Sequence, residues 1–296
     1  MYQSCTLCPR HCGTNRASGQ TGFCGMPSSI QIARASLHRW EEPCISGTNG
    51  SGTVFFTGCN LKCVFCQNHI IAIGKKGLEV TTSQLADLFL MLQDKNAHNI
   101  NLVTPSHYIP GIADALMLAK NNGLSIPIVY NTGGYDSVEA LSILDGLVDI
   151  YMPDFKYVSS ELSKRYSHAA DYFDVAEKSL AEMFRQVGKP VFEGDILVKG
   201  MIVRHLLLPG CTKDSKAVIR YLYETYGDNI FISIMNQYTP LPHVAAFPEI
   251  DRKVTPEEYD EVVDFAIDLG IENGFIQEGD TARESFIPEF DFTGLL

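Results

Sequence analysis

Cysteine placement constrains this chain more than any other feature of its sequence. Seven of the nine cysteines fall into two groups within the first 66 residues: Cys5, Cys8, Cys12 and Cys24, then Cys59, Cys63 and Cys66. The first residues show no basic stretch followed by an apolar run, as a secretory signal would, so we expect a cytoplasmic, reducing location. An odd number of cysteines in such a compartment argues against a disulfide framework and indicates metal binding.

The second cysteine group has the spacing C-x3-C-x2-C from Cys59 to Cys66. Three thiolates on one short loop can hold three corners of a 4Fe–4S cube and leave the fourth iron without a protein ligand. The alternative is a structural zinc ion, which needs a fourth ligand to complete its tetrahedron, and His69 could supply it. Cys44 and Cys211 are isolated and are most simply free thiols.

Residues 51–296 alternate short apolar runs with amphipathic stretches, which predicts an α/β fold with a parallel sheet. We expect about six strand-then-helix units, with strands over 53–57, 99–104, 126–130, 148–152, 197–208 and 229–235. Six units are fewer than the eight of a closed barrel, which leaves a partial barrel or a doubly wound sheet. Residues 1–50 are rich in Cys, Gly, Ser and Asn and are expected to form a small, loop-rich metal-binding segment ahead of a core domain over 51–296.

Polar or turn-forming residues follow each predicted strand directly. They lie at Gly58, 104–107, 131–134, 154–156, 204–205 and 236–238. The carboxyl ends of parallel strands meet at one edge of the sheet, where α/β enzymes place their active sites. The sequence therefore predicts a site at this edge, beside the second cysteine group.

The stretch from Gly58 to Asn68 resembles the radical S-adenosylmethionine superfamily, whose motif is C-x3-C-x-aromatic-C, with Phe65 at the aromatic position. More narrowly, residues 41–68 resemble paralogues of pyruvate formate-lyase activating enzyme that carry an additional N-terminal cysteine cluster. The resemblance implies a partial (βα)6 barrel of TIM type, in which the second cysteine group binds a 4Fe–4S cluster. It further implies that S-adenosylmethionine binds the unique iron and is cleaved reductively to a 5′-deoxyadenosyl radical that abstracts hydrogen.

The resemblance also implies which residues hold the cofactor, beginning with Phe65. Asp154 and Lys156 match a D-x-K segment in which the lysine neutralises the methionine carboxylate; the alternative is an ordinary salt bridge. Asn131 and Thr132 lie where the family has D-T-N-G and touches the ribose, with Asn in place of Asp. The alternative there is a Gly-Gly turn that leads into a helix.

At the remaining strand ends the sequence either departs from the family motif or allows more than one role. Thr104 and Ser106 lie where the superfamily has G-G-E, so their hydroxyls would accept from the cofactor amine, and His107 could face the substrate. Arg204 lies on a predicted buried strand and needs an anion, either the cofactor carboxylate or an Asp or Glu of the barrel. Residues 236–238 could line the adenine or substrate side.

The first cysteine group offers four thiolates within about twenty residues, separated by glycines that allow tight turns. Such a set can bind zinc or an auxiliary iron–sulfur cluster, and the spacing does not decide between the two metals.

The formal charge of −12 disfavours a nucleic-acid partner, and no apolar run approaches the length of a membrane span. The resemblance predicts an activase that forms a radical on a glycyl radical protein, with an electron donor such as flavodoxin or ferredoxin. One alternative is a radical enzyme that modifies another peptide or a small metabolite. Another is a non-catalytic iron–sulfur or zinc protein, which would leave the polar strand ends without a common purpose.

Overall fold

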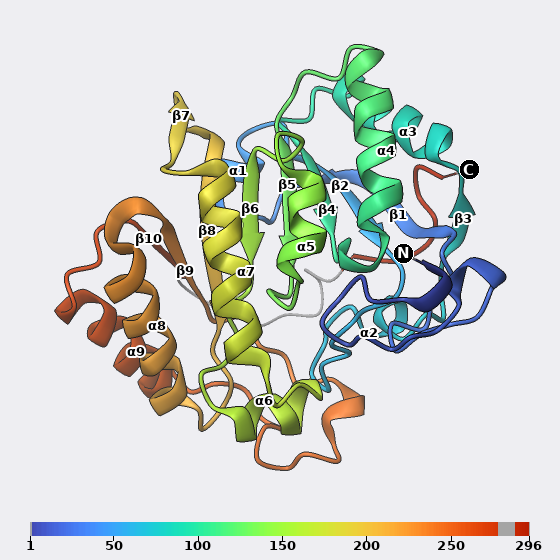
Figure 1. The fold of residues 1–296 in the computed structure, drawn as a ribbon. Coiled ribbons are helices and arrows are strands. Elements are labelled where there is room, and N and C mark those ends of the chain that lie inside the picture. The colour runs from blue at the N-terminus through green and yellow to red at the C-terminus, as the bar shows by residue number, and fades with distance from the viewer. Residues whose placement is uncertain (1, 278–287, 296) are drawn as a thin grey trace.

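The computed structural model describes residues 2–277 and 288–295. Ten strands within these residues form one twisted sheet in the order β10-β9-β8-β6-β5-β4-β2-β1-β3, and β7 pairs with β8 outside this path (Figure 1). Across this part of the chain the two ends of the path, β10 and β3, do not pair with each other, so the barrel stays open.

The six strands predicted from the sequence form the parallel centre of the sheet. Each pairs in parallel with its neighbour in the order β2, β4, β5, β6, β8, β9. They are β2 Ser51–Phe56, β4 Ile100–Val103, β5 Ile128–Thr132, β6 Ile150–Pro153, β8 Ile196–Leu206 and β9 Phe231–Met235. The predicted α/β fold, a partial barrel of parallel strands, is confirmed.

Helices follow these strands and cover the outside of the sheet. Figure 1 shows α4, α5 and α7 in front of the strands, while α8 and α9 flank β9. The helices pack in pairs, α3 on α4, α5 on α7 and α8 on α9. Two begin with capping boxes, at Thr81 and Thr255. Their bounds are α3 Thr82–Asp94, α4 Ile109–Asn121, α5 Val138–Leu141, α6 Ser160–Ser167, α7 Tyr172–Val187, α8 Thr212–Tyr226 and α9 Pro256–Asp268.

One long strand lies in the N-terminal segment that the sequence analysis expected to be rich in loops. β1 (Ile30–His38) pairs antiparallel with β2 and also with β3 (Leu78–Val80). A bulge between Ile32 and Arg34 shifts the alternation of buried residues, which hides the strand period in the sequence. The sequence analysis therefore did not predict β1, while the division into an N-terminal segment and a core domain stays a prediction.

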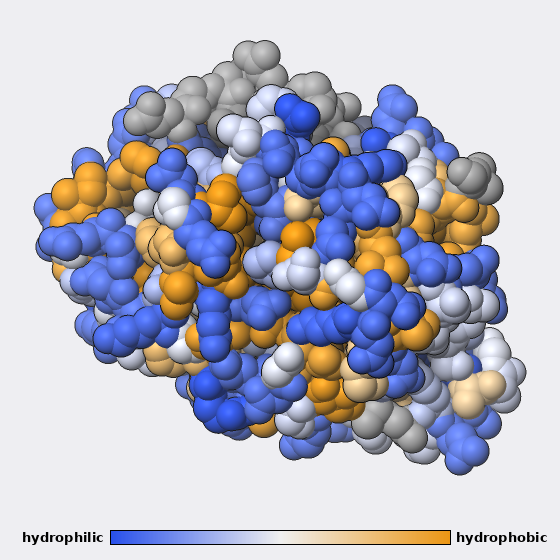
Figure 2. Space-filling model, turned by 90° about the horizontal axis from the view of Figure 1, so that it is seen from above, coloured by the Kyte–Doolittle hydropathy of each residue, from blue (hydrophilic) through white to orange (hydrophobic). Residues whose placement is uncertain are grey.

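The remaining elements are short and lie at the edges of the core. They are α1 Pro43–Ser46, α2 His69–Ala72, β7 Val191–Glu193 and β10 Gly274–Ile276. β7 and β8 form a hairpin at the end of the sheet opposite the carboxyl ends of the parallel strands (Figure 1). Hydrophilic residues cover much of the molecule seen from that end, with hydrophobic residues in scattered groups (Figure 2). None of the helices in the described residues is long and apolar enough to span a bilayer.

Candidate active site

A cavity of about 350 Å³ lies at the carboxyl ends of the parallel strands. Its volume is in the range of small-molecule binding sites. All three cysteines of the second group line it, as do all the predicted cofactor residues except Ser106: Phe65, Thr104, Asn131, Thr132, Asp154, Lys156 and Arg204. The predicted convergence of the strand ends on one site is therefore present in the structure.

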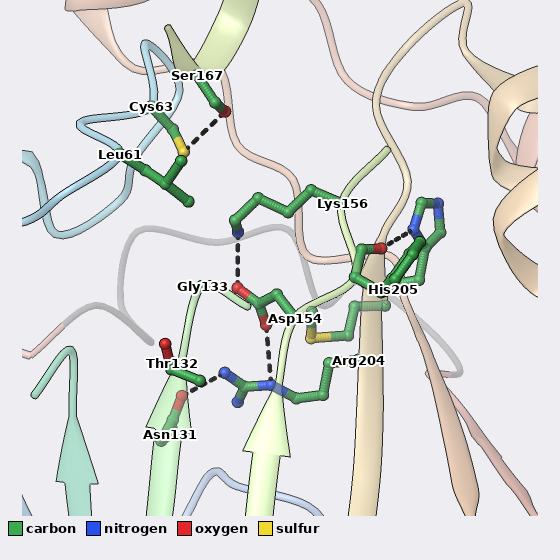
Figure 3. Close-up of polar contacts among 12 residues, drawn as sticks. Leu61, Cys63, Asn131, Thr132, Gly133, Asp154, Lys156, Ser167, Arg204 and His205 are labelled. Carbon is green, nitrogen blue, oxygen red and sulfur yellow. Dashed lines mark hydrogen bonds and ion pairs between the residues drawn. The ribbon is translucent and has the colours of Figure 1, made fainter. Parts of the chain in front are cut away.

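The loop that carries the three cysteines begins after β2 at Gly58. Any other residue at this position would force neighbouring atoms to move. Gly58 has a φ of 92°, and a Cβ there would lie 2.9 Å from the carbonyl oxygen of Cys24. The loop then turns so that the amide of Leu61 donates to the Cys59 sulfur over 3.4 Å. The Ser167 hydroxyl, at the end of α6, donates to the Cys63 sulfur over 2.9 Å (Figure 3).

Burial raises the pKa of the Cys59 and Cys66 thiols, and the neighbouring cysteine sulfurs raise it further. Buried thiols of this kind become thiolates when they bind a metal. Among residues 2–277 and 288–295, no three His, Cys, Asp or Glu side chains are arranged around the position of a single ion. His69, the fourth ligand of the zinc alternative, stacks on His243 with ring centroids 4.2 Å apart.

A chain of alternating charges forms one wall of the cavity (Figure 3). Lys156 Nζ lies 2.6 Å from Asp154 Oδ2, and Arg204 Nε lies 3.1 Å from Asp154 Oδ1. Arg204 continues to Glu41 at 3.2 Å and donates from Nη2 to Asn131 Oδ1 over 2.6 Å. Two cationic side chains and two carboxyl groups thus alternate within a wall whose side chains are 10–18% exposed.

The charges of this wall set each other's protonation. Burial alone would raise the pKa of Asp154, but Lys156 and Arg204 lower it below its usual range. Burial alone would lower the pKa of Lys156, but Asp154 reverses this and raises it. Both residues are therefore charged at neutral pH.

The contacts of Arg204 match the second alternative of the sequence analysis. Each of its three guanidinium nitrogens has an acceptor from the protein, in Asp154, Glu41 or Asn131. Arg204 still lines the cavity. The carboxyl groups that a buried arginine requires as partners are those of Asp154 and Glu41, inside the barrel.

Thr132 is fixed by a buried carboxylate below the cavity. Its hydroxyl donates to Asp136 Oδ2 over 2.7 Å, and the Tyr130 hydroxyl donates to Asp136 Oδ1 over 2.9 Å. Ser106 lies 3.2 Å from the Thr132 hydroxyl and does not line the cavity. The side chain of Ser106 is thus directed to Thr132 and away from the cavity, and its contact with the cofactor stays a prediction.

The neighbours of Ser106 have separate roles. Thr104 lines the cavity and has a φ of 58°, which is unusual for a β-branched residue and occurs at functional sites. His107 is buried away from the cavity, and its Nε2 donates to the Thr57 carbonyl over 2.7 Å. Burial lowers the pKa of His107 to about 3, so it is neutral. It does not face a substrate in the cavity.

Sequence reasoning missed several residues of the lining, among them His38, Trp40, Glu41 and Gln277. Glu41 reaches the site through Arg204, which lies 163 positions further along the chain. Arg204 contacts Glu41 Oε2, and Asn101 on β4 donates to Glu41 Oε1 over 3.0 Å. The two consecutive acidic residues at 41–42 could have indicated that Glu41 belongs to the site, because carboxylates beside a buried strand need cationic partners. Gln237 and Tyr238, which the sequence placed on the adenine or substrate side, also line the cavity.

The parallel partial barrel and its cysteine-lined cavity are the features of a class of radical enzymes. Residues 53–222 match the family model described as the Radical SAM superfamily. The chain therefore belongs to the radical SAM superfamily. A relative, the uncharacterized protein MJ0674 of Methanocaldococcus jannaschii, is 28% identical over 277 residues, which cover 90% of this chain and 75% of that protein.

Solved structures share the fold at low sequence identity. SuiB from Streptococcus suis, bound to its precursor peptide SuiA, has a TM-score of 0.53 at 13% identity over 75% of this chain and 47% of SuiB. HydG, a maturase of FeFe-hydrogenase, has a TM-score of 0.52 at 14% identity over 77% of this chain and 52% of HydG. Methylornithine synthase, PylB, has a TM-score of 0.51 at 14% identity over 80% of this chain and 68% of PylB. The chain spans about half the length of SuiB and HydG, and the likeness shows the fold alone.

The protein uses a 4Fe–4S cluster and S-adenosylmethionine, the cofactors of its superfamily, and SuiB has also been solved with S-adenosylmethionine. The residues of the cavity fit both groups, because three thiols and the ammonium of Lys156 face the same space. When bound, these groups supply one-electron cleavage of a sulfonium and hydrogen abstraction. The chain supplies the ligands, a cation for the cofactor carboxylate and walls that limit access of water.

Proposed function

We propose that this protein is an activase that abstracts hydrogen from a glycine of a partner protein. The observation that carries the proposal is the convergence of Cys59, Cys63 and Cys66 with the Lys156–Asp154 pair on one cavity. The likeness of residues 41–68 to paralogues of pyruvate formate-lyase activating enzyme supports the activase role. A polypeptide substrate is also compatible with the fold, since SuiB binds a precursor peptide.

In this proposal each residue of the cavity has a defined part. Cys59, Cys63 and Cys66 ligate three irons of the cluster. Lys156 binds the cofactor carboxylate while it keeps its contact with Asp154. Thr104 accepts from the cofactor amine, where the superfamily has an acidic residue.

The remaining wall residues hold the other half of the cofactor. Asn131 and Thr132 contact the ribose, and Phe65 packs beside it. Lys156 Nζ lies 6.0 Å from the centroid of the Phe65 ring, which keeps the two on the same side of the cavity. Arg204 holds Asp154 and Asn131 in place and does so without direct contact with the cofactor.

The substrate would enter beside residues that extend the cavity away from the cysteines. Trp40 is 66% exposed and lines the cavity together with His38 and Glu41. An exposed aromatic side chain at the mouth of a site is suited to a peptide, because aromatic residues provide large contact area at polypeptide interfaces. A flavodoxin or ferredoxin would supply the electron, and the reaction would take place in the cytoplasm.

The test is an anaerobic assay with the reconstituted enzyme, S-adenosylmethionine, a reductant and candidate glycyl radical proteins. We expect 5′-deoxyadenosine to form and a glycyl radical to be detected by electron paramagnetic resonance on the partner. A Cys63→Ala variant should form neither, whereas Cys211→Ala, which changes a cysteine outside the cavity, should form both. Formation of 5′-deoxyadenosine with loss of hydrogen from a peptide but no stored radical would replace the activase role with peptide modification.

A further inference from the structure

A buried hydroxyl contacts one cysteine of the second group from another part of the fold. Ser167, the last residue of α6, is fully buried and donates from its hydroxyl to the Cys63 sulfur over 2.9 Å (Figure 3). Cys59 differs, because its sulfur accepts from a backbone amide of the loop itself, that of Leu61. The donor to Cys63 is therefore a side chain, which a substitution can remove while the backbone stays the same.

Tyr157 extends this contact into a chain of hydrogen bonds. Its hydroxyl lies 2.9 Å from the hydroxyl of Ser167, and both side chains are buried. A serine hydroxyl has one hydrogen to donate and an oxygen that accepts. Since the hydrogen of Ser167 is directed to Cys63, Tyr157 is the donor to Ser167. Each hydrogen bond in such a chain polarises the next, so Tyr157 makes Ser167 a stronger donor to the sulfur.

The contact is held in place by bonds between the cysteine loop and the end of α6. The amide of Val64 donates to the carbonyl of Tyr166 over 2.8 Å, which joins the residues next to the two partners. Arg10, in the segment of the first cysteine group, makes a second link. It donates to the carbonyl of Asn60 over 2.7 Å and to the carbonyl of Ser167 over 3.2 Å. The hydroxyl and the sulfur are therefore kept together by the backbone on both sides.

We propose that the chain from Tyr157 through Ser167 to Cys63 raises the reduction potential of the 4Fe–4S cluster. Both residues are positioning residues, because they act through Cys63. A donor stabilises negative charge on a sulfur ligand, and the reduced cluster carries one more negative charge than the oxidised cluster. Hydrogen bonds to the sulfurs are among the features that set the potential of such clusters.

The proposal concerns the cluster and holds whatever the substrate is. Tyr157 follows Lys156 directly in the sequence. The segment after β6 therefore provides both the cation that faces the cavity and the first donor of the chain to the cluster. A test of the potential needs no substrate, so its failure would be distinct from failure of the activase role.

The first experiment measures the midpoint potential in the full chain after anaerobic reconstitution, by redox titration followed with electron paramagnetic resonance. The signal that changes when S-adenosylmethionine is added identifies the cluster at Cys63. For Ser167→Ala we expect the ratio of reduced to oxidised cluster at a given potential to fall about tenfold. For a one-electron couple this is a shift of about 59 mV to a more negative potential.

Ser163→Ala is the matched control. Ser163 lies on the same helix and is also buried, but its hydroxyl donates to the carbonyl of Ser160 over 3.2 Å. We expect its midpoint potential to equal that of the wild type. An unchanged potential in Ser167→Ala, or an equal shift in Ser163→Ala, would overturn the proposal.

The second experiment uses Tyr157→Phe, which keeps the direct contact of Ser167 with Cys63 and removes only the donor behind it. We expect a smaller shift to a more negative potential, and no further shift when Tyr157→Phe is added to Ser167→Ala. This variant also tests the proposal if Ser167→Ala binds no cluster. A potential equal to that of the wild type in Tyr157→Phe, or the same shift in both backgrounds, would show that the chain does not set the potential.

Discussion

Asp154 is the shared partner of two cations in the cavity wall, so replacing it should cost more stability than replacing either cation. Its oxygens lie 2.6 Å from Lys156 Nζ and 3.1 Å from Arg204 Nε. With an effective dielectric constant of about 20, unit charges at these separations attract by about 6 and 5 kcal/mol. Much of this attraction offsets the loss of hydration that burial imposes on the charges.

The net effects follow from which charges remain unpaired. Asp154→Asn leaves Lys156 without an anion and Arg204 with Glu41 alone, and we expect a loss of about 4 kcal/mol in the free energy of unfolding. Lys156→Gln leaves Asp154 paired with Arg204, and we expect a loss of about 2 kcal/mol. At a urea dependence of about 3 kcal/mol per molar, the two midpoints should fall by about 1.3 M and 0.7 M.

Pulse proteolysis in urea under argon is a suitable assay, with all variants stripped of iron beforehand, because cluster loss during unfolding would make the transition irreversible. Glu249→Gln is the matched control. Glu249 Oε1 lies 2.6 Å from Arg165 Nε, the same separation as in the buried pair, but both side chains are at least 40% exposed. We expect no measurable change for it, because water screens exposed pairs. A midpoint for Asp154→Asn as high as that of Lys156→Gln would refute the shared-partner argument.

Three further predictions test the backbone and the protonation states around the site. Gly134→Ala should unfold at a much lower urea concentration than Gly146→Ala: both glycines have a φ of 77°, but only at 134 would the new Cβ meet a backbone oxygen, that of Asp154, at 2.2 Å. Equal midpoints would contradict this. Thr104→Gly should relieve about 1 kcal/mol of strain at a φ of 58° while weakening binding of S-adenosylmethionine in equilibrium dialysis; a clear drop in stability would count against it. Burial lowers the pKa of His205 to about 4 from 6.5, so the unfolded chain binds the extra proton and stability is lost as pH falls below 6.5. Between pH 7.5 and 5.5 the wild type should therefore lose about 1.4 kcal/mol more than His205→Gln, as measured by urea midpoints, and parallel losses would refute the neutral assignment.

The sequence predicted those parts of the site that are set by local spacing. The three cysteines share one loop, and the polar residues at 131–132 and 154–156 come directly after buried strands. In a parallel sheet this position alone places their side chains on one cavity. Ser106 shows the limit of the rule: it follows β4 by three positions, where a 3-10 turn (Ser106–Tyr108) directs its hydroxyl to Thr132.

Long-range pairing was beyond the reach of sequence patterns. Glu41 enters the site through contact with Arg204, and nothing near either residue specifies the other. β1 was missed because its bulge breaks the two-residue period that identifies a half-buried strand. The charge requirement of Arg204 was correctly inferred from its buried strand, but which anion meets it depends on where residues 41 and 154 lie in the folded chain.

The two cations of the wall differ in how they can serve a ligand. A lysine ammonium has three donors, and in the described residues Asp154 takes one of those of Lys156. Lys156 can therefore bind a cofactor carboxylate and keep Asp154. Arg204 directs one N–H of each of its three nitrogens at a protein acceptor, and the remaining two of its five N–H groups stay in a plane that these contacts fix, so rotating the guanidinium toward a ligand would leave a buried oxygen of Asp154, Glu41 or Asn131 without its donor. We therefore expect Lys156 to meet the cofactor and Arg204 to hold Asp154 and Asn131 in position for it.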